Sequence, residues 1–163
     1  RRNLNLAHLA AHKIVDYALA NSCDVIVFEY LDTKGKKKGS KKQKLSMWKH
    51  QDIQNTVERL AHSLGIRVAH VCAWNTSKLA YDGSGVVLRG KKASEDTPYD
   101  ICRFQSGKTY NCDLSASYNI GARYIIKELI KVLPNIMTEV SNIGGGTSRT
   151  LSTLWNINSV MMI

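Results

Sequence analysis

DVIVFEYL, residues 24–31, is a short apolar run rich in β-branched side chains. The polar pair Asn21 and Ser22 precedes it, as at the turn before a strand. Because apolar residues follow one another without alternation, the run predicts a central strand that is buried on both faces. Glu29 lies near its end. A carboxylate there lies either at the mouth of the sheet, where solvent reaches it, or in the core at considerable cost.

Helical and strand-like segments flank this strand. Before it, the apolar spacing over residues 6–18 predicts an amphipathic helix. After it, the spacing over residues 47–64, followed by Gly65, predicts a second helix that ends in a glycine cap. Residues 66–72 have the composition of another strand. This order predicts an α/β fold, with a mixed sheet flanked by helices.

The second half of the chain begins with a polar segment, residues 75–112. Its turn residues 105–108 separate two short strand-like pieces, which predicts a hairpin. Asp113 then opens a third amphipathic helix, which Pro134 stops. Aspartate is also a preferred N-cap, so a purely structural role of Asp113 is the alternative interpretation.

The chain is basic, with a formal net charge of +10. Much of the excess lies in KGKKKGSKKQK, residues 34–44, which contains no acid. Its lysines are Lys34, Lys36, Lys37, Lys38, Lys41, Lys42 and Lys44. Such a run attracts polyanions because it displaces the counterions condensed on phosphates, which favours nucleic acid as the partner. The alternatives are a solvated loop and a localisation signal.

The composition is that of one globular domain with a core. No apolar run reaches the roughly 18 residues of a membrane span and no signal peptide opens the chain, which indicates a cytoplasmic protein without a membrane partner. In that compartment the four cysteines are expected to be reduced thiols. Because the chain opens at Arg1 and enters a helix almost at once, we expect the natural protein to extend further toward its N-terminus.

Three motifs, in this order, resemble a known family. They are VFEYLD at residues 27–32, TSK at 76–78 and CDLSASYNIGARY at 112–124. They resemble the later RuvC motifs of the transposon-encoded TnpB (OrfB) proteins, relatives of type V CRISPR effectors, over about residues 4–133. The resemblance implies a partial RNase H-like (RuvC-like) fold. It also implies a metal-dependent, RNA-guided DNA endonuclease, with DNA and a guide RNA as partners.

The resemblance assigns catalytic, magnesium-binding roles to Glu29 and Asp113, in the places of the second-motif glutamate and the third-motif aspartate. Phosphodiester hydrolysis uses hard cations that activate water and stabilise the leaving oxygen, and Mg²⁺ prefers carboxylate oxygens. The first-motif aspartate is expected on a strand before residue 1. We therefore expect this chain alone to bind magnesium weakly and not to cut.

Other positions in the same motifs are expected to bind nucleic acid. These are Ser77, Lys78 and Asn119, together with the lysines of residues 34–44. Ser115 departs from the pattern, because the family often has asparagine there.

The family also carries a zinc ribbon made of two CxxC pairs, which is degraded here. Residues 79–83, LAYDG, hold no cysteine, and residues 102–105, CRFQ, hold one. A structural zinc site needs about four nitrogen or sulfur ligands, so we predict none. Instead, Cys102 and Cys112 are expected to pack within a degenerate ribbon-like hairpin.

The predicted organisation follows from these motifs: a first part of the RuvC-like core at 1–74, the insertion at 75–112, the third-motif helix at 113–133 and a C-terminal tail at 134–163. Two other functions stay open. One is a non-catalytic protein that binds nucleic acid, either RNA-guided or nonspecifically, and the other is an inactive transposon remnant.

Overall fold

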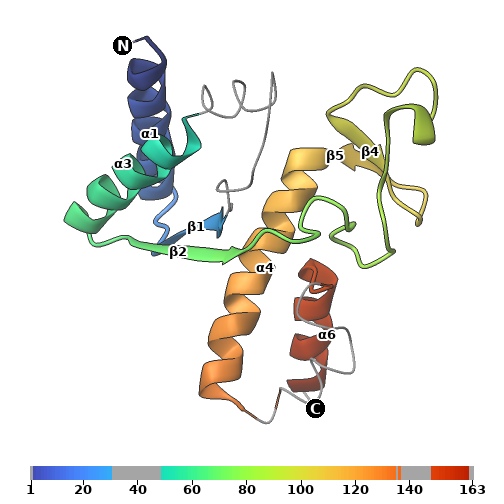
Figure 1. The fold of residues 1–163 in the computed structure, drawn as a ribbon. Coiled ribbons are helices and arrows are strands. Elements are labelled where there is room, and N and C mark those ends of the chain that lie inside the picture. The colour runs from blue at the N-terminus through green and yellow to red at the C-terminus, as the bar shows by residue number, and fades with distance from the viewer. Residues whose placement is uncertain (1, 31–48, 135, 137–147, 162–163) are drawn as a thin grey trace, which may run out of the picture. The chain divides into compact units, whose positions relative to one another are not determined.

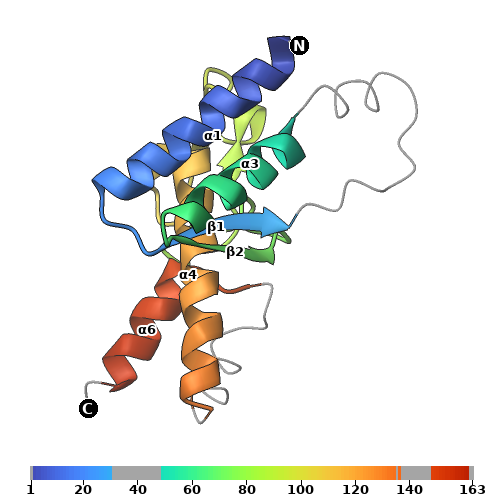
Figure 2. The same cartoon turned by 90° about the vertical axis from the view of Figure 1, so that its left-hand side faces the viewer.

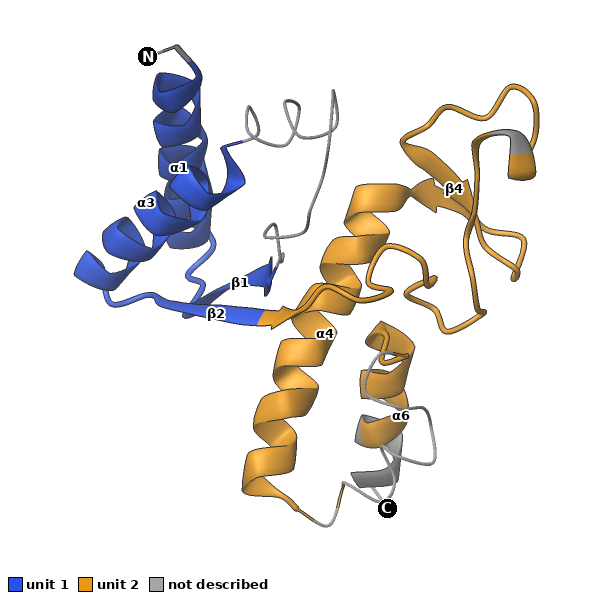
Figure 3. Ribbon diagram, viewed as in Figure 1, with its two compact units in different colours: residues 1–70 blue, residues 71–163 orange. Residues whose placement is uncertain are grey.

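The computed structural model describes residues 2–30, 49–134, 136 and 148–161 (Figure 1). These ranges contain four α-helices, a two-stranded sheet and a three-stranded antiparallel sheet, so the fold is mixed α/β. The chain forms two compact units, residues 1–70 and 71–163 (Figure 3). None of the helices in the described ranges is long and apolar enough to cross a membrane.

The first unit follows the predicted order of helix, strand, helix and strand. Its elements are α1 (Arg2–Ala20), β1 (Val25–Tyr30), α3 (His50–Ser63) and the start of β2 (Arg67–Cys72). The two strands pair, and the Arg67 amide donates to the Asp24 carbonyl oxygen over 2.9 Å where both begin. Their arrows point the same way in Figure 2, as expected for strands that a helix connects.

β1 is the predicted strand, but it is not buried on both faces. Its residues are half-buried, apart from exposed Tyr30. Ile26 and Phe28 pack against the core between α1 and α3. Because side chains alternate along a strand, Glu29 faces the opposite side from these two residues. The prediction of a fully buried strand is wrong because, within the first unit, α1 and α3 pack against one side of it.

Small side chains form the contact between α1 and α3. The buried members are Ala11, Val15 and Ala18 of α1 and Val57 and Ala61 of α3. Two larger apolar residues of α1 point away from this contact, since Leu6 is 57% exposed and Tyr17 is 70% exposed. The helix therefore buries the face that carries Ala11, Val15 and Ala18.

Gly65 ends α3 as predicted. Its φ of +75° lies in the left-handed region, where glycine has no steric penalty. The Gly65 amide donates to the His62 carbonyl oxygen over 3.2 Å, and the Ile66 amide donates to the Ala61 carbonyl oxygen over 2.9 Å. This pair of bonds is the Schellman motif, and it directs buried Ile66 into the core beside Ala61.

The second unit contains the predicted hairpin. β4 (Ile101–Arg103) and β5 (Thr109–Asn111) pair antiparallel, and β3 (Leu88–Arg89) adds to the other edge of β4. The Phe104 amide closes the turn by donating to the Lys108 carbonyl oxygen over 2.8 Å. A short 3-10 helix (Gly90–Lys92) follows β3.

Two helices complete the second unit. α4 (Cys112–Val132) is the predicted third helix and ends before Pro134, whereas α6 (Leu151–Met161) lies in the tail for which the sequence suggested no structure. The two pack side by side, with buried Ile126 of α4 against buried Ile157 of α6 (Figure 1).

Candidate functional site

Glu29 occupies the next-to-last position of β1 and is half-buried. Its backbone carbonyl oxygen accepts a hydrogen bond from the Gln54 side chain of α3 over 3.3 Å, which ties the end of the strand to the helix. Of the two predicted environments, the structure shows the accessible one rather than full burial.

Asp113 is exposed and is the second residue of α4. The N-cap is Asn111, whose Oδ1 accepts from the Asp113 amide over 3.0 Å and from the Leu114 amide over 3.1 Å. The alternative interpretation of Asp113 as the cap is therefore wrong, because its neighbour performs that role. Its carboxylate lies in the first helical turn, where the helix dipole favours negative charge.

The two carboxylates belong to different units, Glu29 to the first and Asp113 to the second. Among the described residues, no three His, Cys, Asp or Glu side chains gather where they would hold a metal ion. The donor chemistry still suits magnesium, which binds proteins through one or two carboxylates and keeps several waters. An exposed carboxylate such as that of Asp113 leaves room for those waters.

Ser77 and Lys78 are exposed in a turn that follows β2. Backbone contacts hold this turn in place: Arg89 Nη2 donates to the Ser77 carbonyl oxygen over 2.5 Å, and the Val87 amide donates to the Lys78 carbonyl oxygen over 2.9 Å. Their side chains are thus accessible on a turn whose backbone is held by hydrogen bonds.

Asn119, expected at the nucleic-acid surface, is instead fully buried, with 0% exposure. Its Nδ2 donates to the carbonyl oxygens of Thr76 over 3.0 Å and of Leu79 over 2.9 Å. Its Oδ1 accepts from the Leu151 amide over 3.2 Å. The amide therefore joins α4 to the turn that carries Ser77 and to the start of α6, and it has no surface left for a phosphate.

Arg123 is a structural residue that the sequence analysis missed. It lies one turn after Asn119 on α4, and it is buried. Its Nη1 donates to the carbonyl oxygens of Cys72 over 2.8 Å and Trp74 over 2.7 Å, while Nε donates to that of Arg149 over 3.2 Å. The available signal was a set of three polar residues at four-residue spacing, Ser115, Asn119 and Arg123, on an otherwise apolar helix face.

The predicted nucleic-acid-binding lysines of residues 34–44 lie outside the described residues. Their role stays a prediction.

The hairpin cysteines pack as predicted. Cys102 and Cys112 are free, buried thiols in one core cluster. Burial, together with the neighbouring Cys112 thiol, raises the pKa of Cys102 to about 11. Cys102 is therefore a neutral thiol at physiological pH.

The carboxylate of Asp82 joins the 79–85 loop to the turn of the hairpin. Asp82 Oδ1 accepts from the Ser84 amide and hydroxyl over 3.0 and 2.7 Å, and Oδ2 accepts from the Ser106 hydroxyl over 2.7 Å. Burial opposes ionisation, but these hydrogen bonds and nearby Lys108 outweigh it and lower the pKa of Asp82. The bond to Ser106 crosses from one turn to the other.

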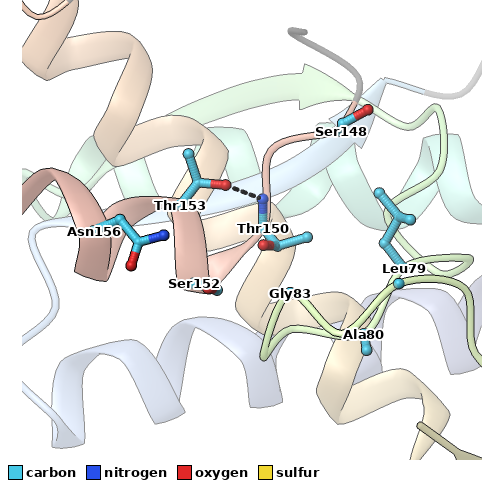
Figure 4. Close-up of a pocket in the computed structure, with 9 residues that line it drawn as sticks. Leu79, Ala80, Gly83, Ser148, Thr150, Ser152, Thr153 and Asn156 are labelled. Carbon is cyan, nitrogen blue, oxygen red and sulfur yellow. Dashed lines mark hydrogen bonds between the residues drawn. The ribbon is translucent and has the colours of Figure 1, made fainter. Parts of the chain in front are cut away.

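A cavity of about 350 Å³ lies between the 79–85 loop and the start of α6 (Figure 4). It is lined by Leu79, Ala80, Gly83, Gly85, Ser148, Thr150, Ser152, Thr153 and Asn156. The amides at this helix start already have partners: that of Thr150 donates to Thr153 Oγ1 over 3.1 Å, and that of Ser152 to the Tyr81 carbonyl oxygen over 2.9 Å. The cavity is therefore not a ready anion site.

Comparisons with known proteins support the fold. No family model matches the sequence, and no curated protein matches it. Among solved structures, the chain is similar to Cas12f1 in the cryo-EM structure of the Cas12f1–sgRNA–target DNA complex, with 22% identity and a TM-score of 0.57. The match covers 74% of this chain and 33% of that one. The chain thus shares the fold of part of a Cas12-like protein and spans about a third of its length.

Proposed function

We propose that the chain forms part of a metal-dependent, RNA-guided DNA endonuclease of the TnpB kind. The similarity to Cas12f1, a protein solved with sgRNA and target DNA, carries this proposal, because it extends over 74% of the chain. The fold proposed with it is a partial RNase H-like fold with a degenerate ribbon-like hairpin.

In this proposal Glu29 and Asp113 hold Mg²⁺ through their carboxylates. The bound metal supplies charge stabilisation and an activated water for phosphodiester hydrolysis. Asp113 is exposed in the first turn of α4, so its carboxylate is accessible to a metal ion. Because Asn111 caps the helix, the Asp113 carboxylate is not required for that role.

The basic residues hold the nucleic-acid backbone. In this proposal Ser77 and Lys78, which are exposed on their turn, contact a phosphate, and the lysines of residues 34–44 add a salt-dependent attraction. Sequence specificity comes from base pairing with the guide, so no base-reading helix is needed.

A plasmid cleavage assay on the full-length parent protein, with guide RNA and magnesium, tests this function. Glu29→Gln and Asp113→Asn should each reduce cleavage by at least about a hundredfold, since each removes a metal ligand. Glu58→Gln and Asp96→Asn serve as matched controls, because Glu58 on α3 and Asp96 in the second unit are exposed carboxylates. Equal cleavage by wild type and both site variants refutes the site. Guide-dependent binding without any cleavage by wild type supports the non-catalytic alternative.

A further inference from the structure

A cluster of aromatic rings lies in the second unit, centred on Tyr81. The Tyr81 ring makes edge-to-face contacts with four other rings: Phe104 at 5.5 Å between ring centroids, Tyr110 at 5.2 Å, Tyr118 at 5.1 Å and Trp155 at 6.3 Å. Such edge-to-face contacts stabilise aromatic clusters beyond the area that they bury. The rings come from the 79–85 loop, the hairpin, α4 and α6, so the fold assembles them from distant parts of the sequence.

The cluster is buried at one end and exposed at the other. Phe104 and Tyr81 are buried, whereas Tyr118 is 41% exposed and Trp155 is 52% exposed. We call the exposed rings of Tyr118 and Trp155 the aromatic platform. Because both rings rest against Tyr81, they are held in place before any ligand arrives, which lowers the entropic cost of binding.

A positive charge lies beside these rings. Lys108 Nζ is 4.9 Å from the ring centroids of both Tyr81 and Tyr110, in cation–π geometry, and it donates a hydrogen bond to the Tyr81 hydroxyl. In the described part of the chain Lys108 forms no ion pair. Nearby Asp82 is occupied by Ser84 and Ser106.

The Tyr110 phenol adds no negative charge to this surface. The Tyr110 hydroxyl donates to that of Tyr118 over 3.4 Å, and this contact raises the pKa of Tyr110 to about 12. The Tyr110 phenol is therefore neutral at physiological pH, next to the Lys108 ammonium.

We infer that the aromatic platform binds unpaired bases of single-stranded nucleic acid, with Lys108 beside the phosphate backbone. Bases have flat aromatic faces and a polyanionic backbone, which match the rings and the charge of this surface and the +10 charge of the chain. A duplex is excluded because its base faces are already stacked on one another. The inference rests on the proposed nucleic-acid function and adds a binding surface to it.

Fluorescence of Trp155 tests the contact directly. The chain has three tryptophans, so replacing Trp48 and Trp74 with phenylalanine in the 163-residue chain leaves Trp155 as the single reporter. Titration with a short oligothymidylate should quench its emission saturably, and a duplex of equal length should quench it much less. Quenching that is equal for both, or absent for the single strand, overturns the inference.

Affinity measurements then test the rings individually. Tyr118→Leu and Trp155→Leu keep apolar bulk but remove the stacking face, and each should weaken single-strand binding roughly tenfold. Tyr118→Phe and Trp155→Phe keep a ring and should bind nearly as wild type. Tyr99→Leu is the matched control, because Tyr99 is 85% exposed and has no ring contact among the described residues.

The outcomes separate this inference from the proposed function. Unchanged binding by Tyr118→Leu and Trp155→Leu, in variants whose circular dichroism and melting temperature match wild type, overturns the platform alone. If a leucine variant unfolds, the platform is tested instead by the binding of Tyr118→Phe and Trp155→Phe and by the fluorescence titration of Trp155. In one outcome, the parent protein cuts guided DNA while the platform variants bind single strands as tightly as wild type does. That result would support the proposed function and refute the aromatic platform. The cleavage assay alone tests the proposed function.

Discussion

The Asn119 side-chain amide donates to the backbone carbonyl oxygen of Thr76 over 3.0 Å, across 43 positions of the sequence. The same amide reaches Leu79 and Leu151, so one buried side chain holds a turn, a helix start and the middle of α4 together. This contact places the exposed residues Ser77 and Lys78, which directly follow Thr76 in the chain. Asn119 thus positions the turn of Ser77 and Lys78, and we do not expect it to contact nucleic acid itself.

Replacing Asn119 with leucine should strongly destabilise the second unit. The change removes the hydrogen bonds of Asn119 to the Thr76 and Leu79 carbonyls and to the Leu151 amide, each of which contributes roughly 0.5–1.5 kcal/mol. Urea denaturation gives the free energy of unfolding. Lys127→Leu, exposed on the same helix, is the control. A loss for Asn119→Leu no larger than that of the control contradicts the role assigned to the amide.

Asn111 and Asp113 should separate capping from metal binding. Asn111→Ala removes both cap hydrogen bonds and should cost about 1 kcal/mol of stability, with cleavage by the parent protein largely kept. Asp113→Asn should change stability by only a few tenths of a kcal/mol, about the strength of a helix-dipole contact, and abolish cleavage. Thermal melts measure the loss of stability expected for Asn111→Ala, and the cleavage assay measures the loss of activity expected for Asp113→Asn. The reverse pattern would return Asp113 to a structural role.

Gly83 should resist substitution more than another glycine of similar conformation. Its φ is +79°, and an added Cβ would lie 2.8 Å from Ser152 Oγ at the start of α6. Gly107 has a φ of +88° with nothing near an added Cβ, so Gly107→Ala measures the backbone strain alone. We expect Gly83→Ala to cost about 1–3 kcal/mol more than Gly107→Ala, as in overpacked sites. Adding Ser152→Gly to Gly83→Ala should restore most of that difference in urea denaturation; no restoration would exclude the clash.

The Asp82 contacts should make stability depend on pH in the acid range. The folded-state pKa lies below the ordinary value of 3.8, so the folded chain keeps Asp82 charged where the unfolded chain protonates it. This contribution is present above pH 3.8 and is lost as the pH falls through the folded-state pKa. Asp82→Asn should therefore lower stability near neutral pH and flatten its decline in acid.

Unfolding free energies measured from neutral pH to below 3.8 check this slope. Ser106→Ala, which removes the bond between the two turns, should reproduce part of the effect. Asp96→Asn controls for the loss of one exposed carboxylate from the same unit. Parallel pH profiles for wild type and Asp82→Asn would mean that the hydrogen bonds do not favour the charged form.

Local sequence patterns determined most of the fold elements. The spacing of apolar residues located α1, α3 and α4, β-branched runs located β1 and β2, and turn residues located the hairpin, because each signal depends on neighbours a few positions away. Gly65 was identifiable for the same reason, since a helix end needs a left-handed residue. Glu29 and Asp113 were chosen from motif order; Glu29 is half-buried and Asp113 is exposed, and the role of both remains proposed.

Tertiary structure decided which polar residues serve the fold and which face solvent. No local pattern distinguishes a buried asparagine from one that contacts phosphate; Asn119 is buried because its partners are backbone groups about 40 positions earlier and 32 positions later. α6 lies in the predicted C-terminal tail, where the sequence has no clear helical periodicity, and it is stabilised by packing on α4. The aromatic platform exists only because Tyr118 of α4 and Trp155 of α6 both contact the Tyr81 ring. Such contacts depend on three-dimensional neighbours, which a linear sequence does not display.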